Sequence, residues 1–274
     1  MQEYGVGIFS TVPTKSALKK AIKKGRVFVN GKEASTAIQI RGNEIITLHA
    51  PAPISSGKQL VMPLEVLYED DDLAVIHKPA GILVSGNHFR TISNALEQNL
   101  NQSAKLDAVR PQPVHRLDYP TTGVLLVGKT SSSITALNSL FEQQQVSKTY
   151  LAITIGDMPL QGSLTTPIHT KKAHSDYTVL KTVPSARFGK LNLVSLSPKT
   201  GRRHQLRIHL AGLGNPILGD QHYGQTPLIL KGKGLYLHAF SLELPHPITG
   251  KRMVFKKDLL PKFHSIFPKD QESL

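Results

Sequence analysis

The sequence predicts an α+β protein in which a small basic module precedes a mixed, largely antiparallel sheet domain with a central cleft. Strand-like apolar runs follow one another with few helical segments between them, as is typical of hairpins. Residues 51–63 are rich in Pro, Ala, Ser and Gly and predict a linker. With 39% hydrophobic and 19% charged residues, the chain has the composition of a globular protein. We expect a leader over 1–50, a main domain over 64–265 and a tail over 266–274.

The net charge of +14 favours a polyanionic partner, with nucleic acid first and an anionic membrane surface second. No apolar run approaches the roughly 18 residues of a membrane span, and the N-terminus lacks an apolar signal core. The sequence contains no cysteine, which excludes disulfides, thiolate metal sites and cysteine nucleophiles. We therefore expect a cytoplasmic protein that faces nucleic acid and has no membrane partner.

The leader begins with a basic helix. Thr14 is placed to cap a helix that runs from Lys15 to about Lys24, and Gly25 is placed to end it. Apolar residues form one stripe of this helix and lysines cover the rest, which suits either a phosphate-binding face or a merely solvated one. The candidate RNA-binding cations are Lys19, Lys20, Lys23, Lys24 and Arg26.

A small hairpin follows the basic helix. Arg26–Val29 reads as a strand, Asn30 and Gly31 form a strong tight-turn signal, and Glu44–Leu48 reads as a further strand. Over Lys19–Leu48 the leader resembles the small RNA-binding domain first seen in ribosomal protein S4. This resemblance implies that the leader binds RNA.

The main domain alternates strand-like runs with few helices. The predicted strands are Val66–Tyr68, Leu73–Ile76, Val124–Val127, Lys148–Ile155, Tyr177–Thr182 and Leu191–Leu196. Ser132 is placed to cap a helix over Ser133–Gln145. After Gly201, a second short helix is expected to bury Leu206 and Leu210 and to present Arg203 and Arg207 together on another face.

One stretch combines charge with a turn and a buried strand. Asp118 follows His115 and Arg116, and it precedes the turn Pro120–Gly123 and the apolar run Val124–Val127. A loop braced by a core strand can hold a functional side chain still while it faces solvent. The alternative is that Asp118 only caps or tightens the turn.

Two groups of residues have side chains that could bind a metal ion. Asp70–Asp72 form an acidic run in a hairpin turn, where exposed carboxylates usually serve solubility. His204 and His209 lie five residues apart, a spacing that does not put two rings on one helical face. We expect no metal, and a metal-dependent nuclease remains a minor hypothesis.

Taken together, these motifs resemble the RluA-type pseudouridine synthases over roughly Leu64–Phe255. The residues that carry the resemblance are Lys78–Val84, His115–Asp118 with Thr121–Gly123, and Gly201–Leu210 with Gly219, Asp220, Tyr223 and Gly224. The resemblance implies an isomerase that converts uridine to pseudouridine in structured RNA without a cofactor or metal. An S4-like leader is a common arrangement in this family.

The resemblance also implies roles for individual residues. Asp118 matches the nucleophile, Arg207 matches the arginine that pairs with it, and Tyr150 matches the tyrosine that stacks on uracil and removes the C5 proton. Arg116 matches the arginine that fills the space left by the flipped nucleotide. The expected RNA- or substrate-binding residues of this domain are His115, Arg116, Thr122, Arg202 and His204.

The expected partner is RNA, ribosomal or transfer, with ribosomal RNA favoured, bound by a monomer. A non-catalytic RNA-binding or ribosome-assembly factor that retains the fold is the alternative. The motif set and the basic leader favour the enzyme, whereas the net charge and the separate basic module motivate the non-catalytic factor.

Overall fold

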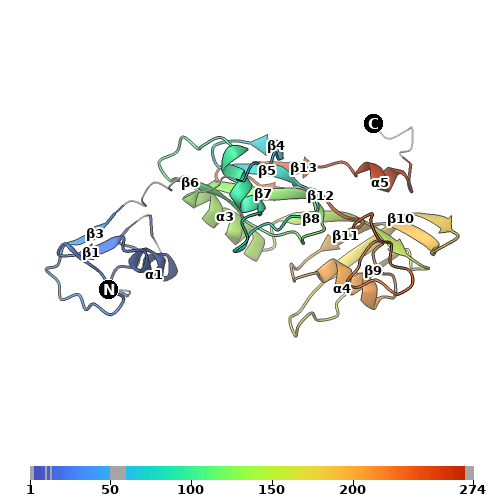
Figure 1. The fold of residues 1–274 in the computed structure, drawn as a ribbon, viewed down its shortest axis with the longest axis horizontal. Coiled ribbons are helices and arrows are strands. Elements are labelled where there is room, and N and C mark those ends of the chain that lie inside the picture. The colour runs from blue at the N-terminus through green and yellow to red at the C-terminus, as the bar shows by residue number, and fades with distance from the viewer. Residues whose placement is uncertain (1–2, 10, 13, 50–59, 269–274) are drawn as a thin grey trace. The chain divides into compact units, whose positions relative to one another are not determined.

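The computed structural model describes residues 3–9, 11–12, 14–49 and 60–268 (Figure 1). The chain divides into two compact units, Met1–Gln59 and Leu60–Leu274, which are described here one at a time. Most of the expected linker, residues 51–59, lies outside the described residues, as does the end of the expected tail.

The first unit packs one helix against a three-stranded antiparallel sheet. Its elements are α1 (Lys15–Lys23), β1 (Val27–Val29), β2 (Lys32–Glu33) and β3 (Ile46–Leu48), with strand order β2-β1-β3. Thr14 caps the helix by accepting a hydrogen bond from the backbone N–H of Ala17 at 3.1 Å. Asn30 and Gly31 both have left-handed backbone, which makes the tight turn between β1 and β2.

The second unit is built on one large sheet, in the order β4-β5-β7-β12-β8-β11-β10-β9, with β6 beside β7 and β13 beside β12. Its strands are β4 (Glu65–Glu69), β5 (Leu73–Lys78), β6 (Ala108–Pro113), β7 (Thr122–Thr130), β8 (Ser147–Ile155), β9 (Gln161–Leu164), β10 (Ser175–Ser185), β11 (Gly189–Pro198), β12 (Leu237–Pro245) and β13 (Arg252–Lys256). Among these described strands, β7 and β12 pair in parallel and the other pairs are antiparallel. The predicted mixed, largely antiparallel sheet is confirmed.

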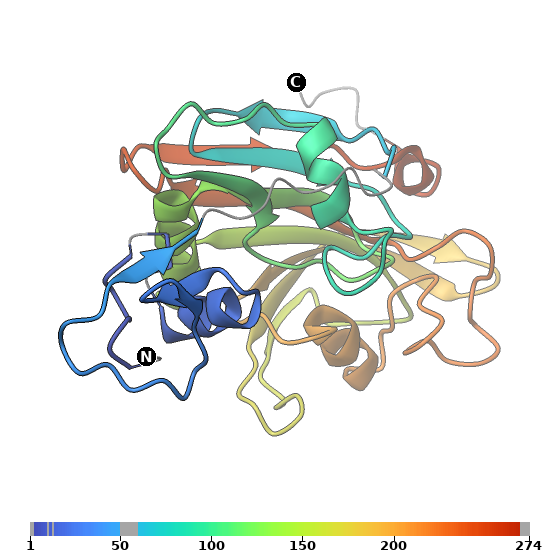
Figure 2. The ribbon, with the colours of Figure 1, turned by 60° about the vertical axis from the view of Figure 1, so that its left-hand side comes forward.

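Helices cover both faces of this sheet. They are α2 (Ile92–Ala95), the 3-10 helix η1 (Leu96–Gln98), α3 (Ser131–Glu142), α4 (Gln205–Gly212) and α5 (Pro261–His264). Leu137 of α3 packs with Leu73 and Val124 on one face, while Ile92 of α2 packs with Ile76 on the other. Residues of α4 and α5 belong to one buried apolar cluster with residues of β8, β11 and β12. In Figure 2 the sheet extends from β4 and β5, drawn in cyan, to β10, drawn in yellow. No helix among the described residues is both long and apolar enough to cross a membrane.

A close approach of two strands explains the glycine that ends the Thr-Thr-Gly motif. Gly123 of β7 lies opposite Ala239 of β12 in the parallel pair. A Cβ atom at Gly123 would lie 2.2 Å from the carbonyl oxygen of Ala239, and the residue has φ +120°. Only glycine allows the two backbones to meet here. This contact fixes the end of the loop that carries Asp118.

Both predicted helices of the main domain differ from expectation at their starts. Thr130, and not Ser132, caps α3: its hydroxyl accepts from the N–H of Ser133, and Ser133 returns the bond to the N–H of Thr130. This reciprocal box shifts the start of the helix by two residues, and α3 ends at Glu142.

The second helix starts four residues after Gly201. His204 has φ +56°, a left-handed conformation that cannot belong to the helix, so α4 begins at Gln205. Arg203 therefore lies before the helix and is exposed, whereas Arg207 lies on its buried side at 5% exposure. The expectation that Arg203 and Arg207 share one helical face is wrong.

The core extends past the expected end of the domain. Phe267 is buried at 4% and belongs to the cluster around α4 and α5, and Ile266 packs against that cluster. The expected tail from 266 therefore begins too early, because these two side chains still contribute apolar packing.

Candidate active-site cavity

A cavity of about 460 Å³ lies in the second unit. It is lined by the segment Val114–Asp118, by the end of α3, by Lys148 and Tyr150 of β8, and by the turn and first residues of α4 from Pro198 to Arg207. Its volume falls within the range of small-ligand sites. The cavity thus brings together the stretch that contains Asp118 and the motif Gly201–Leu210, which are far apart in the sequence.

Asp118 lies in this cavity between two nitrogen-bearing side chains. Its Oδ1 is 3.8 Å from Nε2 of His204, and its Oδ2 is 3.7 Å from Nη1 of Arg207. Both separations exceed hydrogen-bond length, so the contacts are electrostatic. The Asp118 side chain is 14% exposed, and it is therefore held in a defined place while remaining open to a ligand.

Arg207 is fixed by a second carboxylate, Asp220. Its Nε and Nη2 donate to the two oxygens of Asp220 at 2.7 and 2.8 Å, which leaves Nη1 to face Asp118. Burial acts to raise the pKa of Asp220, but the hydrogen bond from Arg207, with the N–H groups of Tyr223 and His222, lowers it overall. Asp220 thus stays ionised and holds the guanidinium in place.

The side-chain amine of Lys78 is hydrogen-bonded to the loop that carries Asp118. Its side chain is fully buried, and Nζ donates to the carbonyl oxygens of Pro79 at 2.9 Å, Tyr119 at 3.3 Å and Thr121 at 2.8 Å. Burial lowers the pKa of Lys78 to about 8, while the charge of Asp118 acts in the opposite direction. The amine thereby links the motif Lys78–Val84 to the motif that contains Asp118 and Thr121.

Tyr150 and Lys148 reach the cavity from β8, where side chains two residues apart point to the same face. Burial raises the pKa of the Tyr150 hydroxyl, and the negative charge of Asp118 raises it further. The phenol therefore keeps its proton at neutral pH. Burial also lowers the pKa of Lys148, whose Nζ lies 6.0 Å from the centre of the Phe141 ring.

His115 lines the cavity but is already bonded to the sheet. Its Nε2 accepts from the backbone N–H of Leu126 at 3.0 Å, and its ring packs against Phe141. Burial lowers the pKa of His115 to about 3, and the charge of Lys148 lowers it further. A neutral ring in this position braces the loop against β7.

Thr122 is not available for the substrate contact expected of it. The residue is buried at 3%, and its hydroxyl bonds Nδ1 of His238 at 2.7 Å. His238 in turn donates from Nε2 to the carbonyl oxygen of Lys257 at 3.0 Å. Thr122 therefore helps to join β7 to β12 instead of facing the cavity.

Cations surround the cavity. Those that line it are Arg116, Lys148, Lys199, Arg202, Arg203 and Arg207, and the carboxylates of Asp118 and Glu142 also line it. Arg116 is exposed, and Arg202 donates from Nε to the carbonyl oxygen of Lys172 at 2.9 Å. This excess of positive charge suits a ligand that carries phosphates.

The histidines suggested for zinc have separate protein partners. Nδ1 of His204 bonds the Tyr223 hydroxyl at 2.9 Å, whereas His209 bonds Ser175 and the carbonyl oxygen of Thr166 at 3.0 Å each. His209 is buried and anchors α4 to β10. The two imidazoles therefore serve different parts of the fold.

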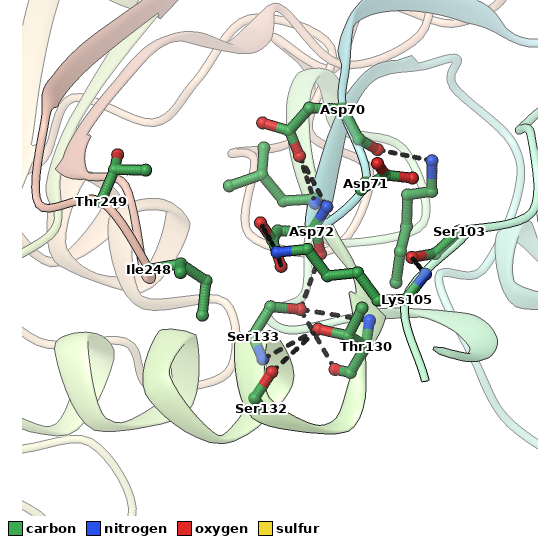
Figure 3. Close-up of polar contacts among 12 residues, drawn as sticks. Asp70, Asp71, Asp72, Ser103, Lys105, Thr130, Ser132, Ser133, Ile248 and Thr249 are labelled. Carbon is green, nitrogen blue, oxygen red and sulfur yellow. Dashed lines mark hydrogen bonds and ion pairs between the residues drawn. The ribbon is translucent and has the colours of Figure 1, made fainter. Parts of the chain in front are cut away.

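The acidic run is more buried than the sequence indicated. Asp72 is 6% exposed, and both its oxygens accept from Nζ of Lys105 at 2.6 and 2.7 Å (Figure 3). Asp70 accepts a hydrogen bond from the Tyr68 hydroxyl and forms another with His246. Asp70, Asp72 and His246 also place potential metal-ligand atoms within 4.8 Å of one another. Because these atoms already have protein partners, the cluster braces the β4–β5 hairpin. The expectation of exposed, merely solubilising carboxylates is wrong for Asp70 and Asp72.

In the first unit, the four lysines predicted to bind RNA are exposed on or directly after α1. Arg26 is partly buried, and its Nε donates to the carbonyl oxygen of His49 at 3.0 Å. These side chains form a basic face of the first unit.

Two residues of the site received no individual role from the sequence. Lys78 was part of a motif, and Asp220 followed Gly219 in another. A lysine at the end of an apolar strand and a lone aspartate after a glycine turn are the signals that mark them. Gly219 has φ +80°, and a Cβ there would meet the carbonyl oxygen of Gly234 at 2.0 Å.

Comparisons with known proteins agree on one family. Residues 72–212 match the family model described as RNA pseudouridylate synthase. The chain is 33% identical to an "Uncharacterized RNA pseudouridine synthase" of Aquifex aeolicus (strain VF5), over 93% of this chain and 88% of that relative. It is 33% identical to the ribosomal large subunit pseudouridine synthase D of Nitrosomonas europaea, over 90% and 77%. The solved structure of human RNA pseudouridylate synthase domain containing 4 superposes with a TM-score of 0.60 at 28% identity, covering 74% of this chain and 92% of that one.

Proposed function

Since this chain belongs to the RNA pseudouridylate synthase family, whose members are isomerases that act on RNA, we propose that it forms pseudouridine in ribosomal RNA at the cavity around Asp118. The observation that carries the proposal is the meeting of Asp118, Arg207 and Tyr150 in one cation-lined cavity. Relatives named for the large ribosomal subunit support ribosomal over transfer RNA. A monomer in the cytoplasm is part of the same proposal.

The reaction breaks the N1–C1′ bond of a uridine, rotates the base and rejoins it through C5. It needs a nucleophile, and the ionised carboxylate of Asp118 is the group we assign to that step. Nη1 of Arg207, held by Asp220, keeps positive charge 3.7 Å from the reacting carboxylate. This charge orients the carboxylate for attack.

Tyr150 is assigned to the base and to the last proton. Its ring offers a face on which uracil stacks, and its hydroxyl would accept the C5 proton of the rejoined base while giving its own proton to N1, which carries a hydrogen in the product. The charge of Asp118 helps to raise the pKa of Tyr150 in the free enzyme.

Arg116 and Arg202 are assigned to the RNA around the target nucleotide. Arg116 is exposed at the cavity, where it can fill the space left by a flipped base. The basic face of the first unit would add phosphate contacts elsewhere on a large folded RNA, in keeping with the S4-like pattern of its sequence.

The test is site-resolved pseudouridine mapping of ribosomal and transfer RNA from cells with and without this protein. Complementation uses the wild type or Asp118→Asn, which changes the nucleophile and little else. We expect a ribosomal site that vanishes and returns only with the wild type. A lost site in transfer RNA would correct the substrate. If no site changes, the non-catalytic RNA-binding factor becomes the better interpretation.

A further inference from the structure

His204 faces Asp118 from a fixed position, and the proposed function assigns no role to its side chain. Its Nε2 lies 3.8 Å from Oδ1 of Asp118, and its Nδ1 is held by the Tyr223 hydroxyl at 2.9 Å. The His204 side chain is 19% exposed and lines the cavity. The ring is thus anchored at one nitrogen and presents the other to Asp118.

The backbone of His204 is built for this orientation. Its φ of +56° is a left-handed conformation that costs a non-glycine residue free energy and persists where neighbours hold it. The buried Gln205 holds the preceding turn by accepting from the N–H of Arg202 at 2.9 Å and donating to the carbonyl oxygen of His174 at 2.9 Å. The N–H of Ile208 donates to the His204 carbonyl at 2.9 Å.

The tautomer of His204 follows from its partners. Nε2 faces a carboxylate and therefore carries the hydrogen, so that Nδ1 accepts from the Tyr223 hydroxyl. Burial lowers the pKa of His204; Asp118 acts to raise it, and Arg207 acts to lower it. A neutral imidazole with a hydrogen on Nε2 faces Asp118.

The gap between His204 and Asp118 fits a group that both donates and accepts. A separation of 3.8 Å is too long for a direct hydrogen bond. A hydroxyl beside both atoms can accept from Nε2 of His204 and donate to Oδ1 of Asp118. Cleavage at C1′ brings the ribose to Asp118, and the carbon bonded to C1′ carries such a hydroxyl, the one that distinguishes RNA from DNA.

We propose that His204 binds the 2′-hydroxyl of the target uridine together with Asp118 and thereby selects ribose over deoxyribose. This inference rests on the proposed function, and it assigns His204 to the sugar instead of to a phosphate. The same bond would place C1′ beside the carboxylate, so that sugar recognition and alignment for attack are one event.

The experiment uses a synthetic RNA hairpin that spans the uridine mapped in cells. Its product form carries pseudouridine at the target, and a partner RNA carries 2′-deoxypseudouridine there; neither can be turned over. A third RNA carries a 2′-deoxy sugar at the next nucleotide. Dissociation constants are measured for the wild-type protein, His204→Asn and His169→Asn. Asparagine tolerates left-handed backbone, and His169 is an exposed histidine with φ +46° outside the cavity.

We expect the wild type and His169→Asn to bind the ribose form about fivefold or more tightly than the target-deoxy form, the scale of a lost hydrogen bond. For His204→Asn the ratio should fall clearly below the wild-type value, because only the bond that the 2′-hydroxyl donates to Asp118 remains, and the neighbouring deoxy sugar should have the same effect on all three proteins.

Two results would overturn the inference while leaving the proposed function intact. One is a His204→Asn variant that discriminates as the wild type does. The other is a variant that loses affinity for both target RNAs equally, which would mean that His204 only shapes the cavity. If the wild type makes no pseudouridine in the unmodified hairpin, or if no uridine is found by mapping, the proposed function fails and the inference falls with it.

Discussion

Arg207 forms its bidentate ion pair with Asp220, and only its remaining nitrogen faces Asp118. The arginine expected to pair with the nucleophile is thus held by another carboxylate. This arrangement gives Asp118 a nearby positive charge without tying up its oxygens in a bidentate pair, and it makes Asp220 the anchor of the site.

Replacing Asp220 should therefore damage both stability and activity. In Asp220→Asn the buried guanidinium of Arg207 loses its counter-charge, and breaking a buried pair in this way typically costs about 3–5 kcal/mol. Urea unfolding measures the change. Asp157→Asn, which removes an exposed partner of Lys190, is the matched control and should change stability little. Equal stability of the two variants would contradict the anchoring role.

Lys78 should give the protein a distinctive alkaline response. Its pKa is about 8 in the folded state, against about 10.4 for an unfolded lysine, so between these values the unfolded state binds more protons. Stability contributed by Lys78 therefore rises with pH in this window, by up to roughly 3 kcal/mol. The free energy of unfolding of the wild type minus that of Lys78→Met should increase from pH 8 to 10.

The same variant should lose activity, because the carbonyl oxygens of Pro79 and Thr121 lose their donor and the loop of Asp118 loosens. The exposed Lys171→Met serves as the control at each pH. A pH-independent difference between wild type and Lys78→Met would mean that Lys78 does not titrate in this range.

His115 should make the protein sensitive to acid. Its pKa is about 3 in the folded state and about 6.5 when unfolded, so the unfolded state takes up the proton first as the pH falls. Between pH 6.5 and 5 the wild type should lose roughly 2 kcal/mol relative to His115→Gln, which keeps an acceptor but does not titrate. Unfolding curves at both pH values test this, with His169→Gln as the exposed control. Parallel losses in wild type and His115→Gln would contradict a neutral His115 ring in the folded protein.

Tyr150→Phe should separate stacking from proton removal. The phenylalanine ring keeps the stacking surface, so RNA affinity should stay near the wild-type value. Loss of the hydroxyl should slow turnover by about 10²–10⁴-fold, the usual contribution of a positioned acid or base. Turnover of RNA that carries deuterium at C5 of the target uridine should show a larger isotope effect in the variant. Unchanged turnover would restrict Tyr150 to stacking.

Local pattern predicted six of the ten strands of the second unit, missed β6, β9, β12 and β13, and misplaced the starts of α3 and α4. Thr14 was identified correctly because one capping residue precedes a clear apolar stripe. Around α3, Thr130 and Ser132 are both good caps, and the buried return bond of Ser133 decides between them. The start of α4 depends on the left-handed His204, which tertiary contacts hold against its intrinsic preference.

The sequence by itself determined the class of fold, the basic character and the family, because periodicity, composition and motif order are properties of neighbouring residues. Only the tertiary structure decided which of these residues serve the cavity. In the fold, buried Thr122 is hydrogen-bonded to His238, Arg207 pairs with Asp220, and Lys78 donates to the carbonyl of Thr121, 43 residues away. Whole strands separate Thr122 from His238 and Lys78 from Thr121, and most of α4 and a turn separate Arg207 from Asp220, so these partners follow from how the elements pack and not from local sequence.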